Sequence, residues 1–354
     1  MKRFVLGQAG ANQCTRVRCA NTTCRSDHLF LRGSLLVSAL SEDVAILGAG
    51  SIGLAFAVLF ARAGASVRLT DPEERQRDEA PGRALARLAD LARYDLLDGQ
   101  SPEAVLARVT VVPGLVAAVA GAAYVQECGP ERLELKRDLL AEVDALAAPD
   151  AILASASSAI PISQSASHLP GRARTLVAHP GNPPFLIPVI ELVPAPFTDP
   201  LVVDRAATLL AKAGMAPVRL GKEVEGFVFN RLQGALLREA YCLVRDGVAT
   251  VEDIDTIVRD GLGPRWSVIG PFETADLNTQ GGIASHAAKM GPAYARMGAE
   301  RGQNDPWTDA LVAEVEAQRR GRLPIAGWAE RVAWRDRRLM ALTRYRRTAV
   351  ENEP

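Results

Sequence analysis

The stretch VAILGAGSIGLAFAVLFARAGASVRLTD, residues Val44–Asp71, decides the fold of this chain. It begins with four apolar residues, which is enough for one buried parallel strand. The pattern G-x-G-x-x-G follows at once, with glycines at Gly48, Gly50 and Gly53, and then comes an apolar, Ala-rich segment typical of a helix pressed against a sheet. A strand, a glycine-rich turn and a helix in this order predict a dinucleotide-binding site.

Each glycine has a separate task in such a turn: the first permits the tight bend, the second lets the backbone approach a pyrophosphate, and the third allows close helix packing. Ser51 and Ile52 lie among them, where backbone amides at the helix N-terminus face the phosphates. Asp71 ends the next expected strand, Ser66–Thr70, at the spacing of an acid that holds ribose hydroxyls. Because a carboxylate there repels the 2′-phosphate of NADP, NAD is the predicted cofactor.

Composition sets the broad class. A chain of 354 residues suggests two domains, and 48% hydrophobic with 23% charged residues is typical of a globular protein. The formal net charge is zero, which argues against a nucleic-acid partner, and no apolar run reaches the roughly 18 residues of a membrane span. Five cysteines, an odd number, favour a reduced, cytoplasmic protein.

The first segment, residues 1–41, differs from the rest because it has no sustained hydrophobic period. It contains Cys14, Cys19, Cys24 and His28, but the cysteines lie farther apart than the paired cysteines of usual zinc sites, so no metal site is predicted. A targeting peptide fits its Arg-rich start. We expect an irregular, disordered extension or the product of an upstream start codon, with the folded enzyme beginning near Glu42.

Strand and helix patterns alternate from residue 42 to residue 224, which predicts an α/β domain with a doubly wound parallel sheet of Rossmann type. The later expected strands cover 109–112, 124–128, 152–155, 175–178, 189–193 and 216–219. The expected helices cover 72–97 with a break at Pro81-Gly82, 115–120, 133–147 and 200–213.

Residues 225–350 show helical periods and no convincing strand, which predicts a smaller all-helical domain for substrate binding and dimerisation. Long helices are expected over 226–246 and 251–260, the second opened by a capping box of Thr250 and Asp253. We do not expect one chain by itself to satisfy the packing of all these helices, so a homodimer is predicted.

His179 is the best placed of the four histidines for chemistry, because it follows the strand 175–178 at the edge where ligands bind in open α/β sheets. On position alone, a structural histidine fits equally well. Glu191 stands in the apolar strand VIELVP, where an acid is costly unless it is paired. A neighbouring imidazole would pair it and be held in one tautomer.

Several motifs together resemble the 3-hydroxyacyl-CoA dehydrogenase superfamily, and more narrowly its lambda-crystallin and L-gulonate 3-dehydrogenase branch. They are GAGSIG at 48–53, QECGPERLELKR at 126–137, SASS at 155–158, HPGNPP at 179–184, ELVP at 191–194, GFVFNRLQ at 226–233 and DGLGPRWSVIGPFETADLN at 260–278. They occur in order and cover the chain from about residue 44 to 278.

The resemblance implies that His179 is the general base, that Glu191 is its partner, and that Ser158 and Asn230 hydrogen-bond the reacting oxygen and the imidazole. Without the resemblance, Ser158 also fits a helix N-cap and Asn230 an ordinary polar helix position.

The resemblance further implies that Glu131 and Lys136 lie beside the nicotinamide end of the cofactor. The acyl-CoA enzymes usually have aromatic residues where this chain has Pro180-Gly181, and an Asn in place of Ala156. The lambda-crystallin-like enzymes share the HPxNPP form and the Arg265-Trp266 stretch.

These departures favour oxidation of the 3-hydroxyl of a small, L-gulonate-like hydroxy acid, with Arg265 on its carboxylate. Three alternatives stay open. The substrate could be a short-chain L-3-hydroxyacyl-CoA or L-carnitine, although recognition of a trimethylammonium group favours aromatics and only 5% of this chain is aromatic. The protein could also be a non-catalytic NAD-binding structural protein of the crystallin type.

Overall fold

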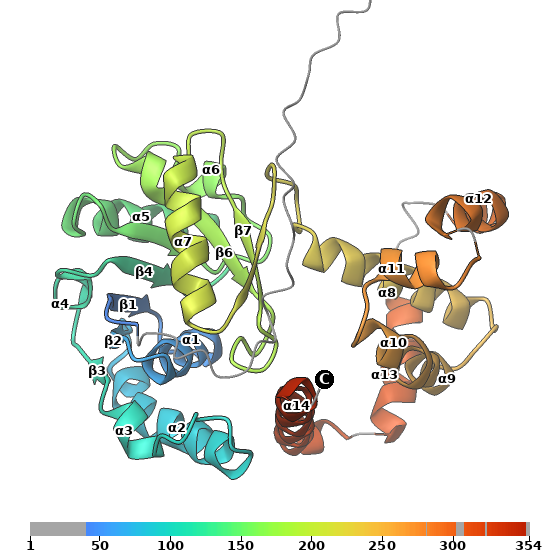
Figure 1. The fold of residues 1–354 in the computed structure, drawn as a ribbon, viewed down its shortest axis with the longest axis horizontal. Helices are drawn as coiled ribbons and strands as arrows, with labels where there is room; N and C mark the ends of the chain where they lie inside the picture. Colours follow the sequence, from blue (N-terminus) through green and yellow to red (C-terminus); the bar gives the residue numbers. More distant parts are fainter. Residues whose placement is uncertain (1–39, 281, 302–307, 323, 352–354) are drawn as a thin grey trace, which may run out of the picture.

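A computed structural model of the chain describes residues 40–280, 282–301, 308–322 and 324–351. The expectations for residues 1–39, including the cysteines and His28, lie outside these described residues. The described chain forms an α/β lobe and a helical lobe, which are joined where the helix α8 leaves the sheet (Figure 1).

One sheet of eight strands forms the centre of the α/β lobe, in the order β3-β2-β1-β4-β5-β6-β7-β8. All neighbouring strands are parallel except β6 and β7. The strands are β1 (Asp43–Leu47), β2 (Ser66–Thr70), β3 (Val109–Val111), β4 (Tyr124–Glu127), β5 (Ile152–Ser155), β6 (Thr175–Pro180), β7 (Val189–Val193) and β8 (Ala216–Arg219).

Helices cover both faces of this sheet, as expected for a doubly wound fold. Side chains of α1 (Ser51–Arg62), α2 (Glu74–Arg93) and α7 (Pro200–Lys212) share one buried cluster, and those of α4 (Leu115–Val119), α5 (Leu133–Leu146) and α6 (Ile162–Ala166) fill two others. The short helices α3 (Pro102–Leu106) and η1 (Arg172–Arg174) complete the lobe.

The antiparallel β6/β7 pair corrects the expectation of a wholly parallel sheet. Only eight residues, 181–188, join the two strands, which is too short for the crossover that a parallel connection needs. The pairing also lengthens β6, since Gly181 N–H donates to the carbonyl of Val189 at 2.9 Å. His179 therefore lies within the strand and does not follow it.

The expected break at Pro81-Gly82 is also wrong, because α2 runs without interruption from Glu74 to Arg93 with Pro81 inside it. Proline removes one helical hydrogen bond, but tertiary packing can compensate for that loss. Ala80, Ala84 and Leu88 are buried on either side of the proline and join the same apolar cluster as α1.

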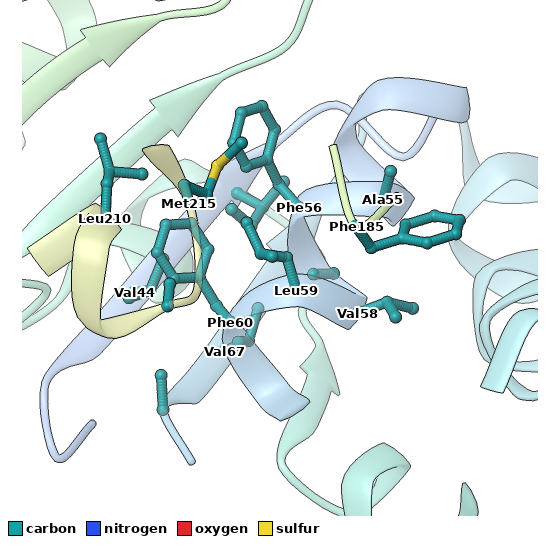
Figure 2. Close-up of a cluster of buried hydrophobic side chains, with 14 of the residues drawn as sticks. Val44, Ala55, Phe56, Val58, Leu59, Phe60, Val67, Phe185, Leu210 and Met215 are labelled. Carbon is teal, nitrogen blue, oxygen red and sulfur yellow. The ribbon is translucent and has the colours of Figure 1, made fainter. Parts of the chain in front are cut away.

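The helix α1 is apolar on nearly all sides because it is buried on all sides. Figure 2 shows Phe56, Leu59 and Phe60 of this helix among side chains of the sheet and of the α7 region. The rings of Phe56 and Phe60 lie 6.0 Å apart, and Phe60 lies 5.6 Å from Tyr124 of β4. This packing fixes the N-terminus of α1 against the ends of the central strands.

Residues after the sheet are helical throughout the described part, as predicted. The elements are α8 (Phe229–Arg245), α9 (Val251–Thr256), the π-helix η2 (Ile257–Leu262), α10 (Gly263–Trp266), α11 (Pro271–Leu277), α12 (Gly282–Glu300), α13 (Asp309–Arg322), η3 (Ile325–Gly327) and α14 (Trp328–Glu351). The capping box of Thr250 and Asp253 is present at α9. None of the described helices is long and apolar enough to cross a membrane.

The last helix, α14, returns to the α/β lobe (Figure 1). Met340 is 3% exposed and belongs to the cluster around α1, with Leu339 packed beside it. Arg347 pairs with Asp98 at 2.8 Å on the same side. The two lobes thus share apolar packing at the end of the chain as well as the connection through α8.

Substitution by alanine is expected to affect stability at one glycine of the G-x-G-x-x-G turn and not at another. A Cβ at Gly53 would lie 1.8 Å from the backbone oxygen of Gly48, whereas a Cβ at Gly50 meets nothing within 4 Å. We expect Gly53→Ala to destabilise the fold by about 1–3 kcal/mol, as overpacking does. Gly50→Ala is the control and should leave the melting temperature unchanged. Equal melting temperatures of the two variants would contradict this packing.

Candidate active site

The glycine-rich turn lies at the carboxyl end of β1, beside β4. The order in which strands are added reverses here: β2 and β3 lie on one side of β1, and β4 and β5 lie on the other. Open α/β sheets bind ligands at such a switch point. Gly48 has a φ of +108°, a conformation that favours glycine, and a Cβ there would lie 2.9 Å from Cys128 O. The turn is thus fixed in shape by the end of β4.

The N-terminus of α1 suits a phosphate group. Its N-cap is Gly50, so no side chain accepts from the amides of the first turn, which includes Ser51 and Ile52. The open space beside Gly50 allows a ligand to approach the backbone closely. Free amides and the helix dipole together favour an anion at this position.

Asp71 lies next to the same turn, as predicted. Its Oδ2 accepts from Ala49 N–H at 2.7 Å, and its Oδ1 accepts from Glu73 N–H at 2.9 Å. The nearby Arg75 pairs with Glu79 at 3.3 Å. An anion site on α1 beside an acid directly after β2 fits a dinucleotide whose adenosine ribose carries free hydroxyls, which is NAD.

His179 and Glu191 face each other across the β6/β7 pair, where they are direct register partners. His179 Nδ1 lies 2.8 Å from Glu191 Oε2. Both residues are buried, with 7% and 3% of their surface exposed. The pairing that the sequence analysis predicted for these two residues is therefore present, and it follows directly from the antiparallel register.

The second oxygen of Glu191 holds the start of α8. Glu191 Oε1 accepts from the backbone N–H groups of Val228 and Phe229 at 2.8 and 2.9 Å. Burial alone would raise the pKa of Glu191, but hydrogen bonds from His179, Phe229 and Val228 outweigh it and lower the pKa. The carboxylate is thus held in its charged form, which suits a partner of an imidazolium.

Aromatic rings enclose the imidazole of His179. Phe227 and Phe229 lie 5.6 and 6.1 Å from it, between ring centres, and Phe227 is fully buried. Phe227 has a φ of +51°, so the backbone turns sharply just before α8 begins. This turn brings both rings and the helix N-terminus to the same histidine.

Ser158 and Asn230 also come together at this place. Asn230 lies in the first turn of α8 and donates from Nδ2 to the backbone carbonyl of Ser158 at 2.9 Å. The loop that carries Ser158 follows β5, the strand next to β6. The four residues that the resemblance assigned to catalysis therefore lie on adjoining elements.

Glu131 holds the Ser158 loop from the other side. Its Oε1 accepts from the Ser157 hydroxyl at 2.6 Å and from the N–H groups of Ser158, Ala159 and Ile160 at 2.9–3.3 Å. Burial would raise the pKa of Glu131, but these hydrogen bonds and the charge of Lys136 lower it.

Lys136 is only 2% exposed and contacts Glu131 at 3.6 Å. The expectation that these two residues lie beside the nicotinamide stays a prediction.

Glu127 is a residue that the sequence analysis missed. It ends β4, is 1% exposed and pairs with Lys136 at 2.9 Å. An acid at the end of a buried apolar strand, with a lysine nine residues later, was the available signal.

Arg265 lies on α10 and is exposed. Figure 1 shows α10 among the helices of the helical lobe. The helix α10 packs against η2 and α11. The structure brings His179, Glu191, Ser158, Asn230 and Glu131 together, but it does not add Arg265 to them, and its role stays a prediction.

The lowered pKa of Glu191 predicts a pH dependence of stability. Its contribution is fully present above the ordinary glutamate pKa of about 4.3 and is lost as the pH falls through the lowered value. Glu191→Gln should therefore reduce the melting temperature most at pH 7, with the difference shrinking toward pH 3. The exposed Glu134→Gln variant is the control. A difference that does not change with pH would contradict the assignment.

Comparison with known proteins agrees with this geometry. The family model for the 3-hydroxyacyl-CoA dehydrogenase NAD-binding domain matches residues 43–224, and the model for the C-terminal domain of the same family matches residues 226–329. These two matches cover both the sheet and most of the helical lobe.

Two similar proteins and one solved structure extend the likeness. The chain is 37% identical to lambda-crystallin of Oryctolagus cuniculus, over 88% of this chain and 98% of that protein. It is 37% identical to an L-carnitine dehydrogenase of Streptomyces griseus, over 85% of this chain and 89% of the other. A 5-formyl-3-hydroxy-2-methylpyridine 4-carboxylic acid 5-dehydrogenase, an NAD+-dependent dismutase, superposes with a TM-score of 0.75 at 28% identity, covering 89% of this chain and 100% of that one.

The paired family models, a relative of this identity and length, and a nucleotide turn that fits NAD lead to one conclusion. The chain belongs to the 3-hydroxyacyl-CoA dehydrogenase family and is an NAD-dependent oxidoreductase that acts on hydroxyl groups.

Proposed function

We propose that this protein oxidises the 3-hydroxyl of a small L-3-hydroxy acid, L-gulonate or a similar compound, to the 3-keto acid. The buried His179–Glu191 pair carries the proposal, because it places a base at the carboxyl edge of the sheet. The glycine-rich turn and Asp71 would hold NAD, which would supply the acceptor for the hydride on C3 of the substrate.

The hydrogen bond to Glu191 selects the tautomer of His179. A carboxylate can only accept, so Nδ1 carries the hydrogen and Nε2 is left with a lone pair. Nε2 then takes the proton of the substrate hydroxyl as general base. The charged form of Glu191 stabilises the resulting imidazolium, as the acid does in other histidine pairs.

Ser158 and Asn230 orient the reacting oxygen in this proposal. The side chain of Asn230 already bonds the backbone of Ser158, so the two residues are held in one arrangement before substrate binds. Prior alignment of this kind lowers the entropic cost of reaching the reactive geometry.

Sequence features favour a free acid over a thioester. Pro180-Gly181 stands where the acyl-CoA enzymes usually have aromatic residues, and Ala156 stands where they usually have an Asn. Arg265 is the cation proposed for the carboxylate of a free acid. L-Carnitine and short 3-hydroxyacyl-CoA thioesters are the other candidate substrates, since relatives of this chain carry those names.

We also propose that the active form is a homodimer, assembled through the helical lobe. Large apolar side chains of this lobe are exposed, and a partner subunit could bury them: Leu232, Val268, Phe272 and Leu277 are 63–84% exposed. A cytoplasmic location, which the cysteine count favours, stays a prediction.

Replacing His179 tests the mechanism. His179→Ala should lower kcat by about 10²–10⁴-fold, which is the range of general-base catalysis, and should leave NADH affinity nearly unchanged. The control is His168→Ala, because His168 is exposed in a turn. Near-normal turnover of the His179 variant would refute its role as the base.

Replacing Arg265 tests the choice of substrate. Arg265→Ala should raise KM for a free hydroxy acid by about 10–100-fold, which corresponds to one lost charge-assisted hydrogen bond, with kcat much less affected. Arg296→Ala, on an exposed position of α12, is the matched control. An unchanged KM would remove Arg265 from the substrate site.

A further inference from the structure

A buried ion pair lies at the carboxyl end of β4 and takes no part in the proton transfer proposed above. Lys136 Nζ contacts the two carboxylate oxygens of Glu127 at 3.0 and 2.9 Å. The exposed fractions of the two residues are only 2% and 1%. Burying both charges is costly unless every donor and acceptor is satisfied, so the surroundings of the pair matter.

Three neighbours, Gly129, Ser155 and Lys136, hydrogen-bond the carboxylate of Glu127. Its Oε1 accepts from Gly129 N–H at 2.6 Å, and its Oε2 accepts from the Ser155 hydroxyl at 2.5 Å, in addition to Lys136. Ser155 ends β5, so the carboxylate ties the ends of two adjacent strands together. Ser155 Oγ in turn accepts from Ser157 N–H at 3.2 Å.

Lys136 extends this network to the loop that carries Ser158. Its ammonium lies 3.6 Å from Glu131 Oε2, while Glu131 Oε1 accepts from Ser157 Oγ and the three N–H groups that follow. The lysine therefore stands between two carboxylates. Glu127 is hydrogen-bonded to the start of the loop at Ser155, and Glu131 is hydrogen-bonded to its middle.

Asn230 contacts the same loop from the helical lobe: its Nδ2 donates to the carbonyl of Ser158 at 2.9 Å. A shift of the loop would move the Ser158 hydroxyl and the amide of Asn230 together. The charges of Glu127 and Lys136 are thus connected to the reacting groups by an unbroken series of short contacts.

We propose that Glu127 is a positioning residue, which holds the Ser155–Ile160 loop through Ser155 and, by way of Lys136, through Glu131, so that Ser158 and Asn230 meet the reacting oxygen. This inference rests on the roles proposed above for Ser158 and Asn230. Lys136 links the two carboxylates in this account, and its predicted place beside the nicotinamide is unchanged.

A double-mutant cycle tests the proposal on the intact protein. The changes are Glu127→Gln and Ser158→Ala, singly and together, with kcat, KM and the affinity for NADH measured for each. Glu127→Gln should lower kcat by roughly 10- to 100-fold, the effect of a small misplacement of reacting groups, with NADH affinity changed by less than about threefold. In the Ser158→Ala background the same change should have little further effect on kcat, because the two residues act through one group.

Two variants complete the design. Glu127→Gln/Lys136→Met removes both charges and so leaves no unpaired ion to unfold the protein; it should show the same loss of kcat. Glu134→Gln, exposed on the same helix as Lys136, should behave as wild type.

Independent, additive effects of Glu127→Gln and Ser158→Ala on kcat would overturn the proposal, as would a loss of melting temperature with kcat unchanged. A loss of NADH affinity in Glu127→Gln that matches the loss of kcat would overturn it too. The cycle uses any hydroxy substrate that the wild-type protein oxidises, so it can fail while the proposed function holds. Absence of turnover with every free acid would instead count against the proposed function alone.

Discussion

The carboxylate of Glu191 is the constraint on which the candidate site depends. One of its oxygens holds the imidazole of His179, and the other accepts from Val228 and Phe229 at the start of α8. A single buried charge therefore holds both the imidazole of His179 and the start of the helical lobe. Because Asn230 lies in the first turn of α8, its distance to the Ser158 loop is set by the same contact.

Sequence patterns predicted the first half of the fold well, since the turn at Gly48 and the strand ending at Asp71 are local features. The antiparallel direction of β7 was not predicted, because it depends on the short connection 181–188 and hydrophobic periodicity does not indicate strand direction. The continuous α2 was missed for a related reason: burial against α1 compensates for Pro81. In both cases tertiary packing decided what local signals could not.

The candidate site was predicted to a similar extent. His179 and Glu191 could be paired from chemistry alone, because an acid in an apolar strand needs a partner. The resemblance was needed to assign the other residues to the site, namely Ser158, Asn230 and Lys136. Isolated polar residues on helices and loops have no distinctive sequence pattern. Glu127 was missed because its partners Lys136 and Ser155 meet it only after β4, β5 and α5 are assembled.

The central claim is that a free 3-hydroxy acid is the substrate of this NAD-dependent site. The most direct measurement is NADH formation by the purified protein, with L-gulonate, L-3-hydroxybutyrate, L-carnitine and 3-hydroxybutyryl-CoA compared side by side at mildly alkaline pH. Parallel reactions with NADP test the cofactor. Turnover of L-gulonate or L-3-hydroxybutyrate with NAD, above that of the thioester and carnitine, is the result expected here. Turnover of the thioester alone would contradict the account and assign the protein to fatty-acid chemistry.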